Sequence, residues 1–133
     1  MRELKFNQKF YNIILSGNKT QTTRIKDKKF KVGEIVEAVF ININEVRFDY
    51  KIPLKITKIV QKRYMDITSE DGENEGYIKH NNRFGDSAEN QLKNELTNIY
   101  SNIHMDTIIY CYYFRIAYPY EVNKKFSIME EEE

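Results

Sequence analysis

The sequence is poor in the residues on which several common kinds of protein depend. Its 133 residues include no tryptophan, one cysteine, two histidines, two prolines and five glycines. A single cysteine excludes a disulfide framework within the chain, and isolated histidines do not make a zinc site. The glycines show neither P-loop nor dinucleotide-binding spacing. Since no segment approaches the ~20 apolar residues that cross a bilayer, we expect a cytoplasmic protein with no membrane, metal or cofactor.

Aromatic and aliphatic residues are abundant instead. Ten tyrosines and eight phenylalanines contribute to a hydrophobic share of 41%, which favours a packed globule over a disordered chain. The length fits one domain, and no repeat, linker or change of composition divides it, so residues 1–133 are expected to form a single domain. Cys111 lies in an apolar run with Tyr110, Tyr112 and Tyr113, where a role in the core is the expected one.

Positive charge gathers near the N-terminal end of the chain. Residues 1–31 hold nine Lys or Arg against only Glu3 and Asp27, whereas Glu130 to Glu133 form an acidic tail. A basic surface of this kind suits a polyanion or a nucleotide. A solvated lysine-rich face explains the same charges equally well.

Periodicity predicts an α+β domain. Apolar residues with helical spacing favour helices over residues 7–16 and 88–100, and a short helical turn starts near Ser69. β-branched and alternating residues predict strands over residues 4–6, 20–25, 35–40, 54–60 and 106–115, with a strand or hairpin over 41–52. Pro53 is expected at an edge or a strand start, and residues 79–86 as a loop. The sum is a β-barrel or strongly curved sheet with two or three helices.

The segment from Gly17 to Arg24 carries the clearest chemical signal. It lies where the helical pattern stops and a threonine-rich strand begins. Alternation along a strand places Thr20, Thr22 and Arg24 on one side, and Lys19 enters from the preceding turn. Two hydroxyls and two cations are therefore expected together, and the acidic segment around Glu75 is the other candidate.

Four features in order resemble the ASCH domains, which belong to the PUA-like fold. They are the helix end Ile13-Ile14-Leu15-Ser16-Gly17, the motif Gly17-x-Lys19-x-x-Thr22-x-Arg24, the turn Lys31-Val32-Gly33-Glu34 and the segment Glu75-Gly76-Tyr77. The resemblance covers about residues 4–116 and leaves 117–133 as a C-terminal extension with the acidic tail. It implies a small PUA-like β-barrel of about five to seven strands, flanked by two or three helices, with a cleft where the motif and the Glu75 segment converge.

ASCH domains are generally understood to bind RNA or nucleoside-like ligands. The resemblance thus implies an RNA or nucleoside ligand in a cleft that involves Lys19, Thr20, Arg24, Lys26 and Tyr77. The chain is also similar to bacterial amidohydrolases that remove the acetyl group from 4-acetylcytidine. By that likeness the catalytic set is Lys19, Thr22 and Glu75. In this set we expect the threonine to attack the acetyl carbonyl, the lysine to carry the proton, and the glutamate to orient the lysine or to help protonate the departing cytosine amine.

The sequence leaves two functional classes open. The domain is either a non-catalytic module that binds RNA or a nucleoside, or a small amidohydrolase. A ribonuclease is less favoured because no histidine pair with general acid and base spacing is present. Each residue also has a structural reading: Lys19 as a solvated lysine, Thr22 as a strand former and Glu75 as a surface acid. Relative to the amidohydrolases, the chain has an insertion around residues 79–89.

Overall fold

The computed structural model describes residues 1–78 and 87–123. The loop expected at residues 79–86, which contains His80, lies outside the described residues. So does the acidic tail, Glu130 to Glu133. Within the described ranges, no helix is long and apolar enough to cross a membrane.

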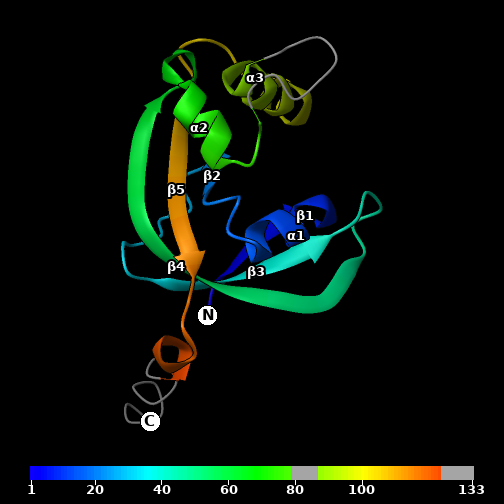
Figure 1. Ribbon diagram of the computed structural model, residues 1–133. Helices are drawn as coiled ribbons and strands as arrows, with labels where there is room; N and C mark the ends of the chain where they lie inside the picture. The colour runs from blue at the N-terminus through cyan, green and yellow to red at the C-terminus, as the bar shows by residue number, and fades with distance from the viewer. Residues whose placement is uncertain (79–86, 124–133) are drawn as a thin grey trace.

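A curled five-stranded sheet forms a half-barrel (Figure 1). The strands are β1 (Glu3–Asn7), β2 (Gln21–Arg24), β3 (Ile35–Ile41), β4 (Arg47–Arg63) and β5 (Ile108–Ile116). Their spatial order is β1-β3-β4-β5-β2, with β1 parallel to β3 and every other neighbouring pair antiparallel. The expected α+β class with a barrel-like sheet is therefore confirmed. Strands β1 and β2 form the two edges of this sheet.

Strand β4 is longer than the sequence predicts. The chain turns after β3 and then runs as one strand from Arg47 to Arg63, where we expected separate strands on either side of Pro53. The first half of β4 pairs with β3 and the second half with β5. The carbonyl of Pro53 accepts from the N–H of Ala117 at 2.9 Å, just beyond the end of β5. Pro53 therefore lies inside a central strand and not at the expected edge or strand start. Its missing N–H breaks no ladder, because this side of Pro53 faces the point where β5 has ended.

The first predicted helix is present in two pieces. A 3-10 turn, η1 (Gln8–Phe10), runs into the short helix α1 (Tyr11–Leu15), because the side chain of Asn7 accepts from the N–H of Lys9 and starts the turn early. Gly17, at φ +82°, ends the segment in the left-handed conformation that the sequence predicts.

The remaining helices follow the end of β4. They are η2 (Tyr64–Asp66), α2 (Ser69–Asn74) and α3 (Ala88–Ile99). The cap of α2 is Thr68: its hydroxyl accepts from the N–H of Asp71, and the Asp71 side chain accepts from the N–H of Thr68. Ser87 caps α3 by accepting from the N–H of Asn90. Both helices therefore have fixed starting points.

Two hydrophobic clusters lie on opposite faces of β5. Tyr112 and Phe114 belong to a larger barrel cluster that includes Phe6 and Phe40. Cys111 belongs to a smaller helix cluster with residues of α3, namely Leu92 and Leu96, together with Ile67 and Ile109. Cys111 and Tyr112 are completely buried, as expected for core residues. Strand β2 pairs with β5 in the same sheet.

Candidate functional site

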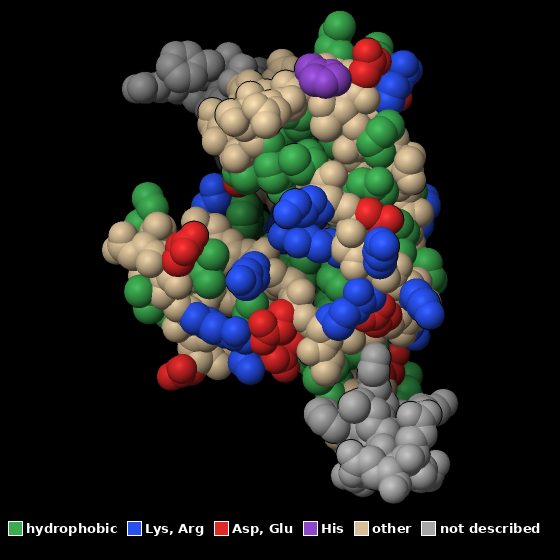
Figure 2. Space-filling view, turned by 180° about the vertical axis from the view of Figure 1, so that it is seen from behind, with side chains coloured by type: hydrophobic (Ala, Val, Ile, Leu, Met, Phe, Trp, Pro, Cys, Tyr) green, Lys and Arg blue, Asp and Glu red, His purple; other side chains and the backbone are tan. Residues whose placement is uncertain are grey.

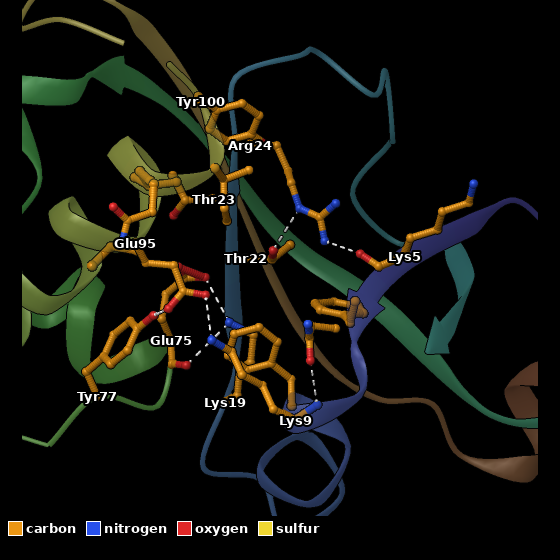
Figure 3. A pocket seen from close by; sticks show the side chains of 17 residues that line it. Lys5, Lys9, Lys19, Thr22, Thr23, Arg24, Glu75, Tyr77, Glu95 and Tyr100 are labelled. Carbon is orange, nitrogen blue, oxygen red and sulfur yellow. Dashed lines mark hydrogen bonds and ion pairs between the residues drawn. The ribbon is translucent and has the colours of Figure 1, made fainter. Parts of the chain in front are cut away.

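A cavity of about 400 Å³ opens between the two edges of the sheet. It is bounded by β1 and the turn that follows, by β2, by the end of α2 and by α3; we call it the edge cavity. Its polar lining includes Lys5, Lys19, Thr22, Arg24, Glu75 and Glu95 (Figure 3). The molecule is hollowed on the face shown in Figure 2, where Lys and Arg side chains lie beside the hollow. The volume falls within the ~300–1,000 Å³ of small-molecule sites.

Lys19 and Glu75 form an ion pair in the wall of this cavity. The Lys19 Nζ donates to Oε1 of Glu75 at 2.9 Å and lies 3.3 Å from the Glu75 main-chain oxygen. Lys19 is 4% and Glu75 5% exposed, so both charges are almost fully removed from bulk water. The ammonium also lies 4.6 Å from the ring centre of Phe10. Two side chains that are 56 residues apart in sequence are thereby joined.

The local backbone explains why Glu75 reaches Lys19. Glu75 is the C-cap of α2, and Gly76 follows at φ +102°, where a side chain would be strained. A Cβ on Gly76 would come within 2.8 Å of Cδ1 of Ile13 in α1. The glycine thus lets the end of α2 approach α1 and the turn that carries Lys19. In the Glu75-Gly76-Tyr77 segment, the glycine is therefore needed for this close approach.

Burial moves the proton affinities of the pair toward each other. Desolvation lowers the pKa of Lys19, and the nearby Arg24 charge lowers it further, while the attraction of Glu75 opposes both. Desolvation raises the pKa of Glu75, against the opposing effect of Lys19. The neutral forms of both groups are therefore closer in free energy than they are in water. Such a pair can pass a proton to or from a bound molecule.

Arg24 connects the two edge strands. Its Nε donates to Oγ1 of Thr22 at 3.0 Å, and its Nη2 donates to the main-chain oxygen of Lys5 at 2.6 Å. Its guanidinium also lies 5.2 Å from the ring centre of Phe6. The side chain thus bridges from β2 to β1 and fixes the Thr22 hydroxyl. Among the described residues, no hydrogen bond links Lys19 directly to Thr22.

Tyr77, Glu95 and Lys9 form another wall. The Tyr77 hydroxyl donates to Oε2 of Glu95, whose Oε1 lies 3.2 Å from the Lys9 ammonium. Burial, with Glu95 as acceptor, raises the pKa of Tyr77, which keeps its proton. The sequence did not single out Glu95 or Phe10. Phe10 shares its apolar stripe with Ile13, but no sequence signal distinguished Glu95 from the exposed acids of a helix.

Five of the seven predicted site residues line the edge cavity: Lys19, Thr22, Arg24, Glu75 and Tyr77. Thr20 and Lys26 are not part of this lining. Thr20 directly precedes β2, and its side chain borders a smaller cavity beside Phe114 and Ile116. Lys26 follows β2 and is exposed. Within residues 1–78 and 87–123, no three His, Cys, Asp or Glu side chains converge as metal ligands would.

Comparison with known proteins identifies the fold. No protein-family model and no curated protein matches the sequence. Among solved structures, an ASCH domain from Lactobacillus crispatus JV V101 superposes with a TM-score of 0.58 at 14% identity, covering 86% of this chain and 78% of that one. A mutant of the ASCH protein ZmASCH from Zymomonas mobilis gives 0.54 at 13% identity, covering 95% and 94%. A protein from Enterococcus faecalis V583 gives 0.59 at 12%, covering 88% and 76%.

Proposed function

We propose that this chain, which has the fold of ASCH domains, binds a nucleoside in the edge cavity, either free or as part of an RNA. The observation that carries the proposal is the buried Lys19–Glu75 pair beside an open cavity. A buried ion pair is often no more stabilising than apolar residues of the same size, so its presence favours a role in binding or chemistry.

The other cavity groups suit such a ligand. Phe10 and Tyr100 offer rings on which a base can stack, and Lys5 and Arg24 offer positive charge to a sugar phosphate. Lys19 supplies a donor and Glu75 an acceptor for the polar edge of a base. The size, aromatic surface and charge of the edge cavity therefore all suit a nucleoside.

The test is calorimetric titration of the protein with a panel of unmodified and acylated nucleosides. We expect binding of at least one member, and loss of at least about tenfold in affinity when Lys19→Met and Glu75→Gln are combined, since each lost polar contact costs roughly 0.5–1.5 kcal/mol. The matched control is Lys51→Gln, which removes a lysine on β4 that pairs with Glu37 outside the cavity. Unchanged affinity in the double variant would contradict the proposal. Salt then separates the two forms of ligand, because only phosphate contacts to RNA weaken steeply with ionic strength.

Hydrolysis of 4-acetylcytidine is the second candidate, and the shifted pKa values of Lys19 and Glu75 favour it. In this reaction Lys19 first passes a proton to Glu75, and Thr22 Oγ1 then attacks the acetyl carbonyl and gives its proton to the neutral Lys19. The tetrahedral intermediate expels the cytosine N4 amine, which takes that proton, and the acetyl group stays on Thr22 as an ester. Water then hydrolyses the ester to acetate and restores the hydroxyl. Arg24 holds the Thr22 oxygen at 3.0 Å from its Nε throughout.

Product analysis by mass tests this activity. Thr22→Ala is expected to abolish release of acetate, and Lys19→Met to do the same. Thr97→Ala on the exposed face of α3 is the matched control and is expected to keep full turnover. Turnover by Thr22→Ala at the rate of the control would exclude the covalent route while leaving nucleoside binding untouched.

A further inference from the structure

The edge cavity lies between two strand edges that have no neighbouring strand. Among the described strands, β2 pairs only with β5 and β1 only with β3. Residues of both strands, including Lys5 and Thr23, line the cavity between them. Main-chain groups on the free side of each strand therefore face this space.

Alternation along β2 identifies which main-chain groups these are. The N–H of Phe114 donates to the oxygen of Thr20 at 2.9 Å, so Thr20 faces β5. In an antiparallel pair every second residue faces the same partner, so Thr22 and Arg24 also bond to β5, and Thr23 faces the opposite way. On β1, the main-chain oxygen of Lys5 points to the same gap, because it accepts from Arg24.

Thr23 is 5% exposed, yet within residues 1–78 and 87–123 no strand lies beside its main-chain N–H and C=O. Its side chain is engaged elsewhere: Oγ1 accepts from Nε2 of Gln21 at 3.4 Å and lies 3.9 Å from Sγ of Cys111, toward the helix cluster. Main-chain groups without a protein partner bond to water or to a ligand, so these two groups are available to a molecule bound in the cavity.

We propose that the main chain of Thr23 reads the ligand, with its N–H donating to an acceptor and its C=O accepting from a donor on one edge of a flat heterocycle. This rests on the proposed function and narrows its ligand to planar groups with a neighbouring acceptor and donor, such as the amide-like edges of nucleobases. An added peptide strand is disfavoured, because Arg24 crosses the gap from β2 to β1 and blocks a chain that would run along β2.

Amide hydrogen exchange measured by NMR on the whole protein tests the proposal residue by residue. In the free protein, the Thr22 and Arg24 amides are expected to exchange at least about tenfold more slowly than that of Thr23, because only they are in the ladder with β5. Saturation with uridine or cytidine, used as probes, is expected to slow Thr23 at least about tenfold and Thr22 less than about twofold.

Two substitutions at Thr23 supply the matched pair. Thr23→Pro removes the N–H on the free side of an edge strand, where proline is tolerated, and is expected to weaken probe binding about tenfold. Thr23→Val keeps the N–H, loses the hydroxyl and is expected to bind within about twofold of the original chain. Circular dichroism checks that both variants fold. If Thr23→Pro does not fold, the hydrogen-exchange experiment alone tests the proposal.

The outcomes separate this inference from the proposed function. Slow exchange of Thr23 in the free protein, or a bound probe that leaves Thr23 unprotected, overturns the main-chain reading while nucleoside binding stands. Equal affinity of folded Thr23→Pro and Thr23→Val overturns it as well. If neither probe nor any nucleoside of the panel binds, the proposed function fails and this inference fails with it.

Discussion

Asp71 and Glu75 lie four residues apart at the end of the sheet, and each pairs with a lysine, but their surroundings differ. The Asp71 carboxylate accepts five hydrogen bonds, from Lys62, Gln21, Tyr113 and both the N–H and hydroxyl of Thr68. Among the described residues, the Glu75 carboxylate accepts one, from Lys19. Asp71 has no place in the lining of the edge cavity, whereas Glu75 does.

The pKa values of these two carboxyl groups are therefore shifted in opposite directions. Burial alone would raise the pKa of Asp71, but the hydrogen bonds from Lys62, Thr68 and Gln21 outweigh it and hold the pKa below its ordinary value. At Glu75 burial prevails and the pKa is raised. A buried carboxylate with many donors stays charged and fastens the fold, whereas one with few donors keeps a proton within reach.

Removal of Asp71 is expected to give the largest effect. Asp71→Ala leaves Lys62, Gln21 and the start of α2 without their shared acceptor, so the free energy of unfolding should fall by about 3–5 kcal/mol, as when a buried pair loses one partner. Urea denaturation followed by circular dichroism measures it. Asp66→Ala, at an exposed acid of η2, is the control and should leave the midpoint unchanged. If Asp71→Ala lowers the free energy of unfolding by much less than this, the Asp71 carboxylate does not stabilise the fold as we infer.

The Lys19–Glu75 pair should behave differently when both partners are replaced. Lys19→Met alone leaves Glu75 buried without a cation, at a cost of about 2 kcal/mol that protonation of the carboxyl limits. Adding Glu75→Gln should restore stability to within about 1 kcal/mol of the original chain, because no buried charge remains.

The equivalent double replacement at the other pair is the control. Asp71→Leu with Lys62→Met should remain more than about 2 kcal/mol below the original chain, because Gln21 and Thr68 still lack an acceptor. Denaturation of Lys19→Met, Asp71→Ala and the two double variants side by side gives the result. Equal recovery at both pairs would show that the number of donors does not distinguish them.

The two carboxylates should also respond to pH with opposite signs. The lowered pKa of Asp71 contributes stability above its unfolded value of 3.8 that is lost as the pH falls through the folded pKa. The raised pKa of Glu75 works the other way: its contribution is complete below 4.5 and declines as the pH rises toward the folded pKa. Unfolding free energies of Asp71→Asn and Glu75→Gln, each compared with the original chain across the acidic and neutral range, should diverge accordingly. Parallel curves would contradict the assigned shifts.

The sequence predicted the residues of one pair much better than those of the other. Strand alternation brought Thr22 and Arg24 together, the preceding turn added Lys19, and the ASCH resemblance implied that the Glu75 segment converges with them. The sequence placed the start of the helical turn near Ser69 and gave Asp71 no role, although Thr68 and Asp71 have the spacing of a capping box. Its other partner, Lys62, comes from β4, and no local pattern reveals which residue of a strand meets a given helix.

The fold shows the same division between local and distant information. Most helices and strands followed from periodicity, and the curved sheet from their number and order. The parallel pairing of β1 with β3 and the gap between β1 and β2 depend on contacts between distant segments, which no periodicity encodes. Thr20 lies outside the edge cavity for a related reason: alternation assigns a side chain to a face of the sheet, but it does not determine which of two cavities the side chain borders.

A third lysine–carboxylate pair, Lys9 with Glu95, gives the smallest expected effect and isolates the role of burial. Their side chains are 57% and 21% exposed, so water solvates the lysine whether or not the pair forms. Lys9→Gln should therefore change the free energy of unfolding by at most about 0.5 kcal/mol, in contrast to either buried pair. Raising the salt concentration should erase even that difference, since exposed charges are screened. A loss comparable to that of Lys19→Met would mean that proximity to the cavity, and not removal from water, determines what these lysines contribute.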